Sequence, residues 1–158
     1  MAAASAEARL AELGIELPGV AAPVAAYVPA VVTGSYVYTS GQLPFVDGAL
    51  PASGKVGEGE GLVAAADAKE YARLCALNAL AAVRAELGSL DRITRVVKLV
   101  GFVASAPDFT GQPGVVNGAS ELLGEVFGEA GRHARSAVGV AVLPLDAPVE
   151  VELVVEFA

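Results

Sequence analysis

Cysteine and histidine are nearly absent from this sequence, which holds one of each, Cys75 and His133, among 158 residues. A single cysteine cannot close an intramolecular disulfide, and one cysteine with one histidine cannot supply the four ligands of a structural zinc site. The lone thiol favours a reducing compartment, and the first ten residues, MAAASAEARL, lack the basic start and apolar run of a secretory signal. We therefore expect a cytoplasmic protein.

Basic residues are also scarce, with 10 Lys and Arg against 18 Asp and Glu, which gives a formal net charge of −8. Nucleic-acid binding depends on cations that displace counterions from phosphate groups, so we expect no nucleic-acid partner. An anionic ligand would have to be met by a local cation.

Uncharged runs are too interrupted to cross a membrane. The longest run extends from Leu17 to Val46, and four prolines and several glycines divide it into short pieces, so we expect no membrane partner. Hydrophobic residues nevertheless make up 54% of the chain and the mean hydropathy is +0.58. This much apolar surface excludes an intrinsically disordered chain, and 158 residues fit one domain.

The residue pattern predicts alternating strands and helices in the order β-β-α-β-α-β-β, after a short N-terminal helix that Ser5 caps and Gly14 ends. We divide the chain into residues 1–25, an N-terminal helix and linker, and residues 26–158, a single domain. This order predicts an α+β sandwich in which two helices cover one face of a mixed sheet. The predicted strands are Tyr27–Val32, Tyr36–Gln42, Ile93–Ala104, Ala134–Leu143 and Val149–Phe157, and the helices are Leu62–Leu87, with Cys75 as a buried filler, and Val115–Phe127.

The last two strands carry the residues of most chemical interest. Alternation places Arg135 on one face with small residues, and the valines of that strand, such as Val138, on the other face, which we expect to meet the helices. In the final strand Glu150 and Glu156 lie opposite an apolar row. Two interpretations stay open: Arg135 binds a small carboxylate beside the small residues, or it pairs with Glu156 across a hairpin.

Two motifs make the chain resemble the RidA/YjgF family of enamine/imine deaminases: Thr39-Ser40-Gly41-Gln42-Leu43-Pro44, and Ala134-Arg135-Ser136 followed by Leu143-Pro144 and Val149-Glu150-Val151-Glu152. The resemblance is collinear over nearly all of the chain beyond Ala25. It implies a chorismate-mutase-like fold and a homotrimer with ligand pockets between subunits. It also implies hydrolysis of reactive enamines and imines, such as 2-aminoacrylate, to 2-keto acids and ammonia, without a cofactor or metal.

The same resemblance assigns roles to individual residues. It implies that Arg135 binds the substrate carboxylate and that Glu150 orients or deprotonates a water molecule. The other substrate-binding residues that it implies are Tyr27, Ser40, Gly41 and Asn117.

The chain also departs from the family pattern. Ala137 stands where many members have a cysteine, and Ser120 stands where an aromatic residue is frequent. A trimer that binds 2-keto acids without catalysis is the alternative function. Some family members are described as endoribonucleases, but the acidic chain and its single histidine argue against that activity.

Overall fold

A mixed five-stranded sheet forms the centre of the molecule. The computed structural model describes residues 4–23 and 25–158, and its strands follow the order β1-β2-β5-β3-β4. Neighbouring strands are antiparallel except β3 and β4, which are parallel. The strands are β1 (Ala30–Thr33), β2 (Tyr36–Thr39), β3 (Ile93–Ala104), β4 (Ala134–Val140) and β5 (Val149–Phe157). The predicted α+β fold is confirmed.

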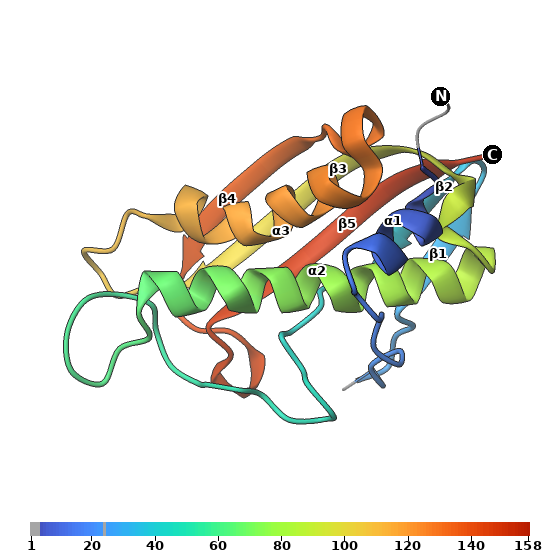
Figure 1. Ribbon diagram of the computed structural model, residues 1–158. Helices are drawn as coiled ribbons and strands as arrows, with labels where there is room; N and C mark the ends of the chain where they lie inside the picture. The colour runs from blue at the N-terminus through green and yellow to red at the C-terminus, as the bar shows by residue number, and fades with distance from the viewer. Residues whose placement is uncertain (1–3, 24) are drawn as a thin grey trace.

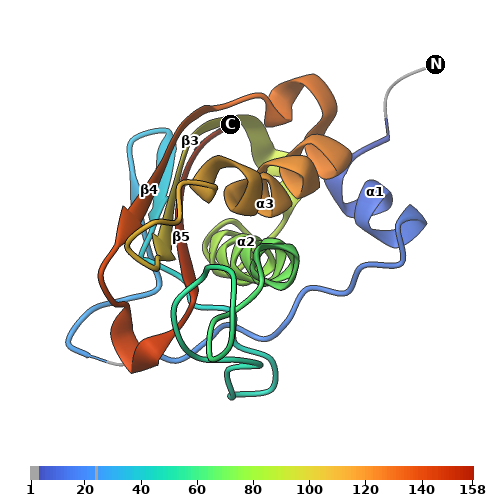
Figure 2. The same cartoon turned by 90° about the vertical axis from the view of Figure 1, so that its left-hand side faces the viewer.

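Two long helices cover one face of this sheet. They are α2 (Ala65–Leu87) and α3 (Gln112–Phe127), which begin close to the predicted Leu62 and Val115. Figure 1 shows the two helices in front of the strands, and Figure 2 shows both on the same side of the sheet. No helix in the described part of the chain has the length and apolar character needed to span a membrane.

A short helix, α1 (Ala6–Glu12), lies beyond the two long helices, on the side away from the sheet (Figure 2). The Ser5 side chain caps it as predicted by accepting a hydrogen bond from the backbone of Ala8 at 3.3 Å. The Glu7 carboxylate accepts a bond from the backbone N–H of Leu90 at 2.9 Å, which ties α1 to the turn after α2. The described residues also form three 3-10 turns: η1 (Leu90–Arg92), η2 (Gly128–Gly131) and η3 (Pro144–Asp146).

The hydrophobic core lies between the sheet and the two long helices. Cys75 is fully buried in it, as predicted, and burial is the main reason that the pKa of its thiol is raised, with the nearby Glu150 charge adding to the effect. A thiol that resists ionisation is a poor nucleophile, so Cys75 has a packing role. The largest fully buried side chains include Val37, Leu80, Val83, Leu99, Val115, Leu122, Leu123 and Leu153.

The connection between the last two strands differs from the prediction. Strand β3 lies between β4 and β5, so the expected hairpin, and with it the pairing of Arg135 with Glu156, is wrong. Helix α3 returns the chain parallel to β3, and the turn at Pro144–Asp146 then carries it across the end of β3 to the far side. Glu156 pairs with Arg95 and Tyr36 near the other end of the sheet.

Helices α2 and α3 cross closely at Gly118, where an added Cβ would overlap the carbonyl oxygen of Lys69. A Cβ at Gly124 on the same helix would meet open space. We expect Gly118→Ala to force the helices apart and to lower the free energy of unfolding by about 1–3 kcal/mol. Gly124→Ala, the matched control, should raise it by up to about 1 kcal/mol, because alanine favours the helix. Urea unfolding measures both, and an unchanged Gly118→Ala midpoint would contradict the close crossing.

Candidate functional site

Arg135 lies on the outer strand β4 and points toward α3. Residues paired across neighbouring strands share a face of the sheet. Arg135 pairs with Leu99, and Leu99 pairs with Leu153, and both leucines are buried on the face that the helices cover. Arg135 therefore belongs to the helix side of the sheet. It does not belong to the opposite face, which α2 and α3 do not cover and which we call the open face.

The prediction that the valines of β4 meet the helices is wrong for the same reason. Val138 pairs with Phe102, which pairs with Glu150. The side chain of Val138 is 43% exposed on the open face. Small residues lie under α3 because the helix passes close to this strand. A Cβ at Gly139 would lie only 2.7 Å from Nε2 of Gln112 in the first turn of α3.

Three oxygen atoms of α3 hold the Arg135 guanidinium. Its Nη1 donates to Oδ1 of Asn117 at 2.7 Å and to Oγ of Ser120 at 3.2 Å. Its Nη2 donates to the carbonyl oxygen of Pro113 at 3.3 Å. The structure thus brings together two of the predicted site residues, Arg135 and Asn117.

All three acceptors of Arg135 are neutral, so the positive charge of the guanidinium is not compensated. Arg73 and Arg84 by contrast pair with Glu125 and Glu7, at 3.3 Å each. Among residues 4–23 and 25–158, no carboxylate lies within ion-pair distance of Arg135. A guanidinium that is oriented but lacks a counter-ion is suited to bind an anionic ligand.

The other predicted site residues form a second group around Glu150 on β5. The segment that contains Gly41 is fixed beside β5 by reciprocal backbone bonds between Gln42 and Val151, of 2.8 and 3.0 Å. These bonds place Gly41 against Glu150 so closely that a Cβ on Gly41 would overlap the carboxylate. Gly41 and Tyr27 line one small cavity of about 20 Å³.

Ser40 belongs to the same group by its position next to Gly41. Its hydroxyl donates to the carbonyl oxygen of Val28 at 2.6 Å, and its backbone N–H donates to that of Pro29 at 2.8 Å. Tyr27 precedes β1, which begins at Ala30, so the prediction that Tyr27 starts this strand is wrong. The hydroxyl of Ser40 therefore anchors the segment that leads into β1.

Glu150 has an increased proton affinity. Its carboxyl is half-buried on the open face of the sheet, and this burial raises its pKa. The charge of Glu152, two residues along the same face, raises the pKa further. A carboxylate whose pKa moves toward neutrality is a better proton acceptor for a water molecule.

The two groups cannot contact one small ligand within a single chain. Arg135 is on the helix side of the sheet, whereas Glu150 is on the open face, level with Val138. Three residues along a strand and two strand spacings separate their Cα atoms by about 14 Å. A site that uses both residues needs a second copy of the chain.

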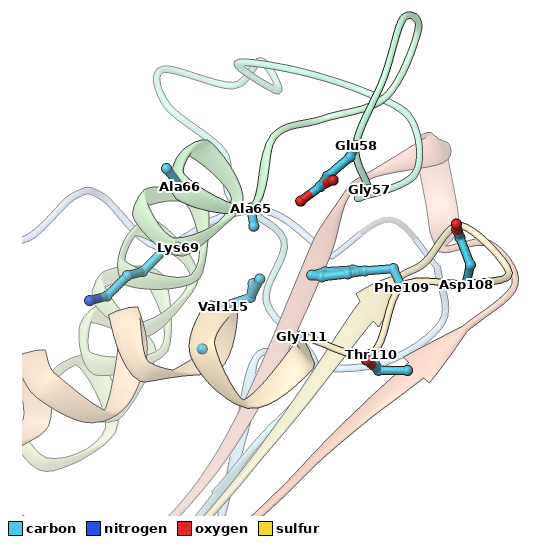
Figure 3. A pocket seen from close by; sticks show the side chains of 11 residues that line it. Gly57, Glu58, Ala65, Ala66, Lys69, Asp108, Phe109, Thr110, Gly111 and Val115 are labelled. Atoms are coloured by element: carbon cyan, nitrogen blue, oxygen red, sulfur yellow. The ribbon is translucent and has the colours of Figure 1, made fainter.

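A larger cavity, of about 600 Å³, lies between the first turns of α2 and α3 (Figure 3). Glu58 and Phe109 point into it, while Lys69 points away and pairs with Glu121 at 3.1 Å. Glu58 and Asp108 both give this cavity negative charge. It therefore suits a small carboxylate less well than the surroundings of Arg135.

A family profile described as "YjgF/chorismate mutase-like, putative endoribonuclease" matches residues 7–157. The chain belongs to this YjgF family. It is 49% identical to Protein TCP17 of Trypanosoma cruzi over 94% of this chain and 92% of that protein. The crystal structure of Atu1372 from Agrobacterium tumefaciens is similar with a TM-score of 0.87 and 48% identity, over 97% of this chain and 92% of that chain.

A third relative in the YjgF family was crystallised with a small molecule. It is TdcF of E. coli with bound serine, which has a TM-score of 0.62 and 29% identity, over 89% of this chain and 93% of that chain. The family and its fold, both expected from the residues around Arg135 and Gly41, are confirmed.

Ser120 and His133 adjoin Arg135 although neither was predicted as a site residue. The hydroxyl of Ser120 lies 2.9 Å from Nε2 of His133 and 3.2 Å from Nη1 of Arg135. Spacing could have revealed both: His133 is two residues before Arg135, and Ser120 is one helical turn after Asn117. No cluster of three or more potential metal-ligating side chains of His, Cys, Asp and Glu occurs in the described residues.

Because the pKa of Glu150 is raised, the effect of Glu150→Gln on the free energy of unfolding should depend on pH. Ionised Glu150 is disfavoured in the folded state, by burial first and by Glu152 second. This loss of stability is absent below the unfolded pKa and complete above the folded pKa, so it grows as the pH rises. Glu150→Gln, which mimics the protonated form, should be more stable than the parent at neutral pH and about equal to it below about pH 4. Urea midpoints at both pH values measure this, and a gain only at acid pH would contradict it.

Proposed function

We propose that this protein hydrolyses reactive enamine and imine intermediates of the 2-aminoacrylate type to 2-keto acids and ammonia. The observation that carries the proposal is the Arg135 guanidinium, which neutral acceptors orient and no carboxylate compensates. The bound serine in TdcF supports it, because serine is also a small molecule with a carboxylate. We assign the reaction to the cytoplasm, where a lone cysteine stays reduced.

The proposed reaction needs the substrate to be held and one water molecule to be activated. Arg135 binds the carboxylate of the imine through two parallel hydrogen bonds. Glu150 of a second copy accepts a proton as the water oxygen bonds to the imine carbon. The substrate is the protonated imine, so this addition gives a neutral carbinolamine. Glu150 returns its proton to the nitrogen, the carbon–nitrogen bond breaks as the hydroxyl becomes the carbonyl, and the departing ammonia takes up the hydroxyl proton, which leaves a 2-keto acid and an ammonium ion. Nitrogen is exchanged for oxygen without oxidation, so the proposal includes no cofactor.

Tyr27, Ser40, Gly41 and Asn117 complete the proposed site. Asn117 fixes the guanidinium, and Gly41 leaves room for the Glu150 carboxylate. Ser40 is next to Gly41 in the chain, and Tyr27 lines the same small cavity as Gly41, where both side chains would close the pocket around the substrate. Exclusion of bulk water and competing thiols is what a reactive imine requires.

We further propose that the protein is a homotrimer whose sites lie between subunits. The separation of Arg135 from Glu150 supports an assembly that brings one residue of each copy together. Apolar side chains on the open face support the same assembly, since Val31 is 52%, Tyr38 48% and Val138 43% exposed. Such a patch is typical of an interface that a partner covers.

Two other functions are less well supported. A trimer that binds 2-keto acids without catalysis would use Arg135 in the same way, but it gives no role to the raised pKa of Glu150. The endoribonuclease name in the family description points to RNA, yet a net charge of −8 opposes binding to a polyanion.

Arg135→Lys is the main test of the proposed function. Lysine keeps the positive charge but cannot form two parallel bonds to a carboxylate. We expect this variant to bind 2-oxobutanoate about ten- to several-hundred-fold more weakly than the parent, and to lose most of its acceleration of pyruvate release from enzymatically generated 2-aminoacrylate. Calorimetry and the coupled assay measure the two effects.

Arg132→Lys is the matched control, because Arg132 is exposed and pairs only with Glu129 in the turn before β4. It should behave like the parent in both measurements. Glu150→Gln should bind 2-oxobutanoate but fail in turnover, whereas unchanged turnover in that variant would favour another base. Normal binding and turnover in Arg135→Lys would refute the carboxylate site.

Light scattering tests the proposed trimer. At micromolar concentration we expect a mass of about 47 kDa, three times the 15.8 kDa of one chain. Val138→Glu places a charge in the apolar open face and should lower both the mass and the activity. Val20→Glu, at an exposed valine outside the sheet, should change neither. A monomer mass for the parent protein would exclude both the trimer and the shared site.

A further inference from the structure

Ser120 and His133 extend the hydrogen-bond network around Arg135. His133 Nδ1 lies 2.6 Å from the carbonyl oxygen of Gly131, and its Nε2 lies 2.9 Å from Oγ of Ser120. That same Oγ accepts a bond from Nη1 of Arg135 at 3.2 Å. Ser120 and His133 are both half-buried.

The chemistry of these groups sets the direction of the hydrogen bonds when the imidazole is neutral. A carbonyl oxygen can only accept, so Nδ1 of His133 carries the hydrogen that bonds to Gly131. In the neutral imidazole Nε2 is then an acceptor, and the hydroxyl of Ser120 donates to it. With its hydrogen directed at His133, Ser120 presents a lone pair to Arg135.

This network leaves one edge of the guanidinium available. The two hydrogens of Nη1 bond to Asn117 and Ser120, and one hydrogen of Nη2 bonds to Pro113. The Nε hydrogen and the second Nη2 hydrogen have no acceptor among the described residues. In a guanidinium the Nε–H and one of the Nη2 hydrogens are parallel on one edge, so this edge matches the two oxygens of a carboxylate when Pro113 accepts the other Nη2 hydrogen.

We propose that Ser120 and His133 are positioning residues that orient Arg135 so that it binds the carboxylate through Nε and Nη2. The inference rests on the proposed function for the identity of the ligand, a 2-keto or 2-imino acid. Neither residue touches the ligand in this arrangement, because both lie beyond Nη1. His133 acts only through Ser120, and Ser120 acts only through Arg135.

A double-mutant cycle on ligand affinity tests this order of action. We expect Ser120→Ala and His133→Phe each to weaken the binding of 2-oxobutanoate about three- to tenfold, as measured by calorimetry. Because His133 acts through Ser120, the double variant should bind no more weakly than Ser120→Ala alone. In the coupled assay these losses should raise KM more than they lower kcat. Ser120→Thr keeps the hydroxyl and should restore affinity.

A measurement without ligand tests the positioning directly. In protein with 15N-labelled arginine, the spectrum of Arg135→Lys identifies the Arg135 signals by their loss. We expect rotation about the Cζ–Nη1 bond to be several-fold faster in Ser120→Ala and His133→Phe than in the parent. Glu121→Gln, one residue along α3 and paired with Lys69, is the matched control and should change neither this rotation nor the affinity.

The outcomes separate this inference from the proposed function. If Arg135→Lys weakens binding but Ser120→Ala and His133→Phe leave affinity and guanidinium rotation unchanged, the positioning role is wrong and the carboxylate site stands. If the parent binds no 2-keto acid while rotation still responds to Ser120 and His133, the proposed function fails and the positioning network stands. Additive losses of affinity in the double variant would contradict the action of His133 through Ser120. A lowered melting temperature with unchanged affinity would indicate a structural role only.

Discussion

The guanidinium of Arg135 determines how the candidate site has to be built. An arginine that carries its charge without a counter-ion must gain its order from neutral hydrogen bonds, and here α3 supplies all of them through Pro113, Asn117 and Ser120. Those three residues share one side of the helix, at the spacing of successive turns. The crossing of α3 over β4 therefore sets the direction of the charge. The close packing at Gly139 fixes α3 against β4, and that at Gly118 fixes α3 against α2.

The order of the strands imposes a second constraint. Because β3 separates β4 from β5, Arg135 and Glu150 cannot converge within one chain. The open face carries Glu150 together with exposed apolar side chains such as Tyr38 and Val138. A monomer would leave both the carboxylates and this patch in water. In the proposed assembly, one contact between copies covers the patch and completes the site.

Much of the local structure could be predicted from the sequence, because apolar alternation decides where central strands begin and end. The predicted bounds of β3 and β5 are those observed. The order of the strands could not be predicted in this way. The short link from β4 to β5 is typical of a hairpin, and its path across β3 depends on packing between residues that are far apart in the sequence. Alternation likewise separated Arg135 from Val138, but only the position of α3 shows which face is covered. The spacing of Asn117, Ser120, His133 and Arg135 was available in the sequence, yet it has meaning only once α3 lies over β4.

Electrostatics connects the two halves of the proposed site. In one chain, burial and Glu152 raise the pKa of Glu150, whereas the charge of Arg135 is uncompensated. In the proposed trimer the guanidinium of a second copy would offset part of this rise, so burial and Glu152 would still disfavour the ionised carboxyl. A bound substrate carboxylate would neutralise the guanidinium, so in the proposed site the proton affinity of Glu150 would increase while the imine is in place. Substrate binding would thus turn Glu150 into a stronger base at the moment when a water molecule has to be deprotonated.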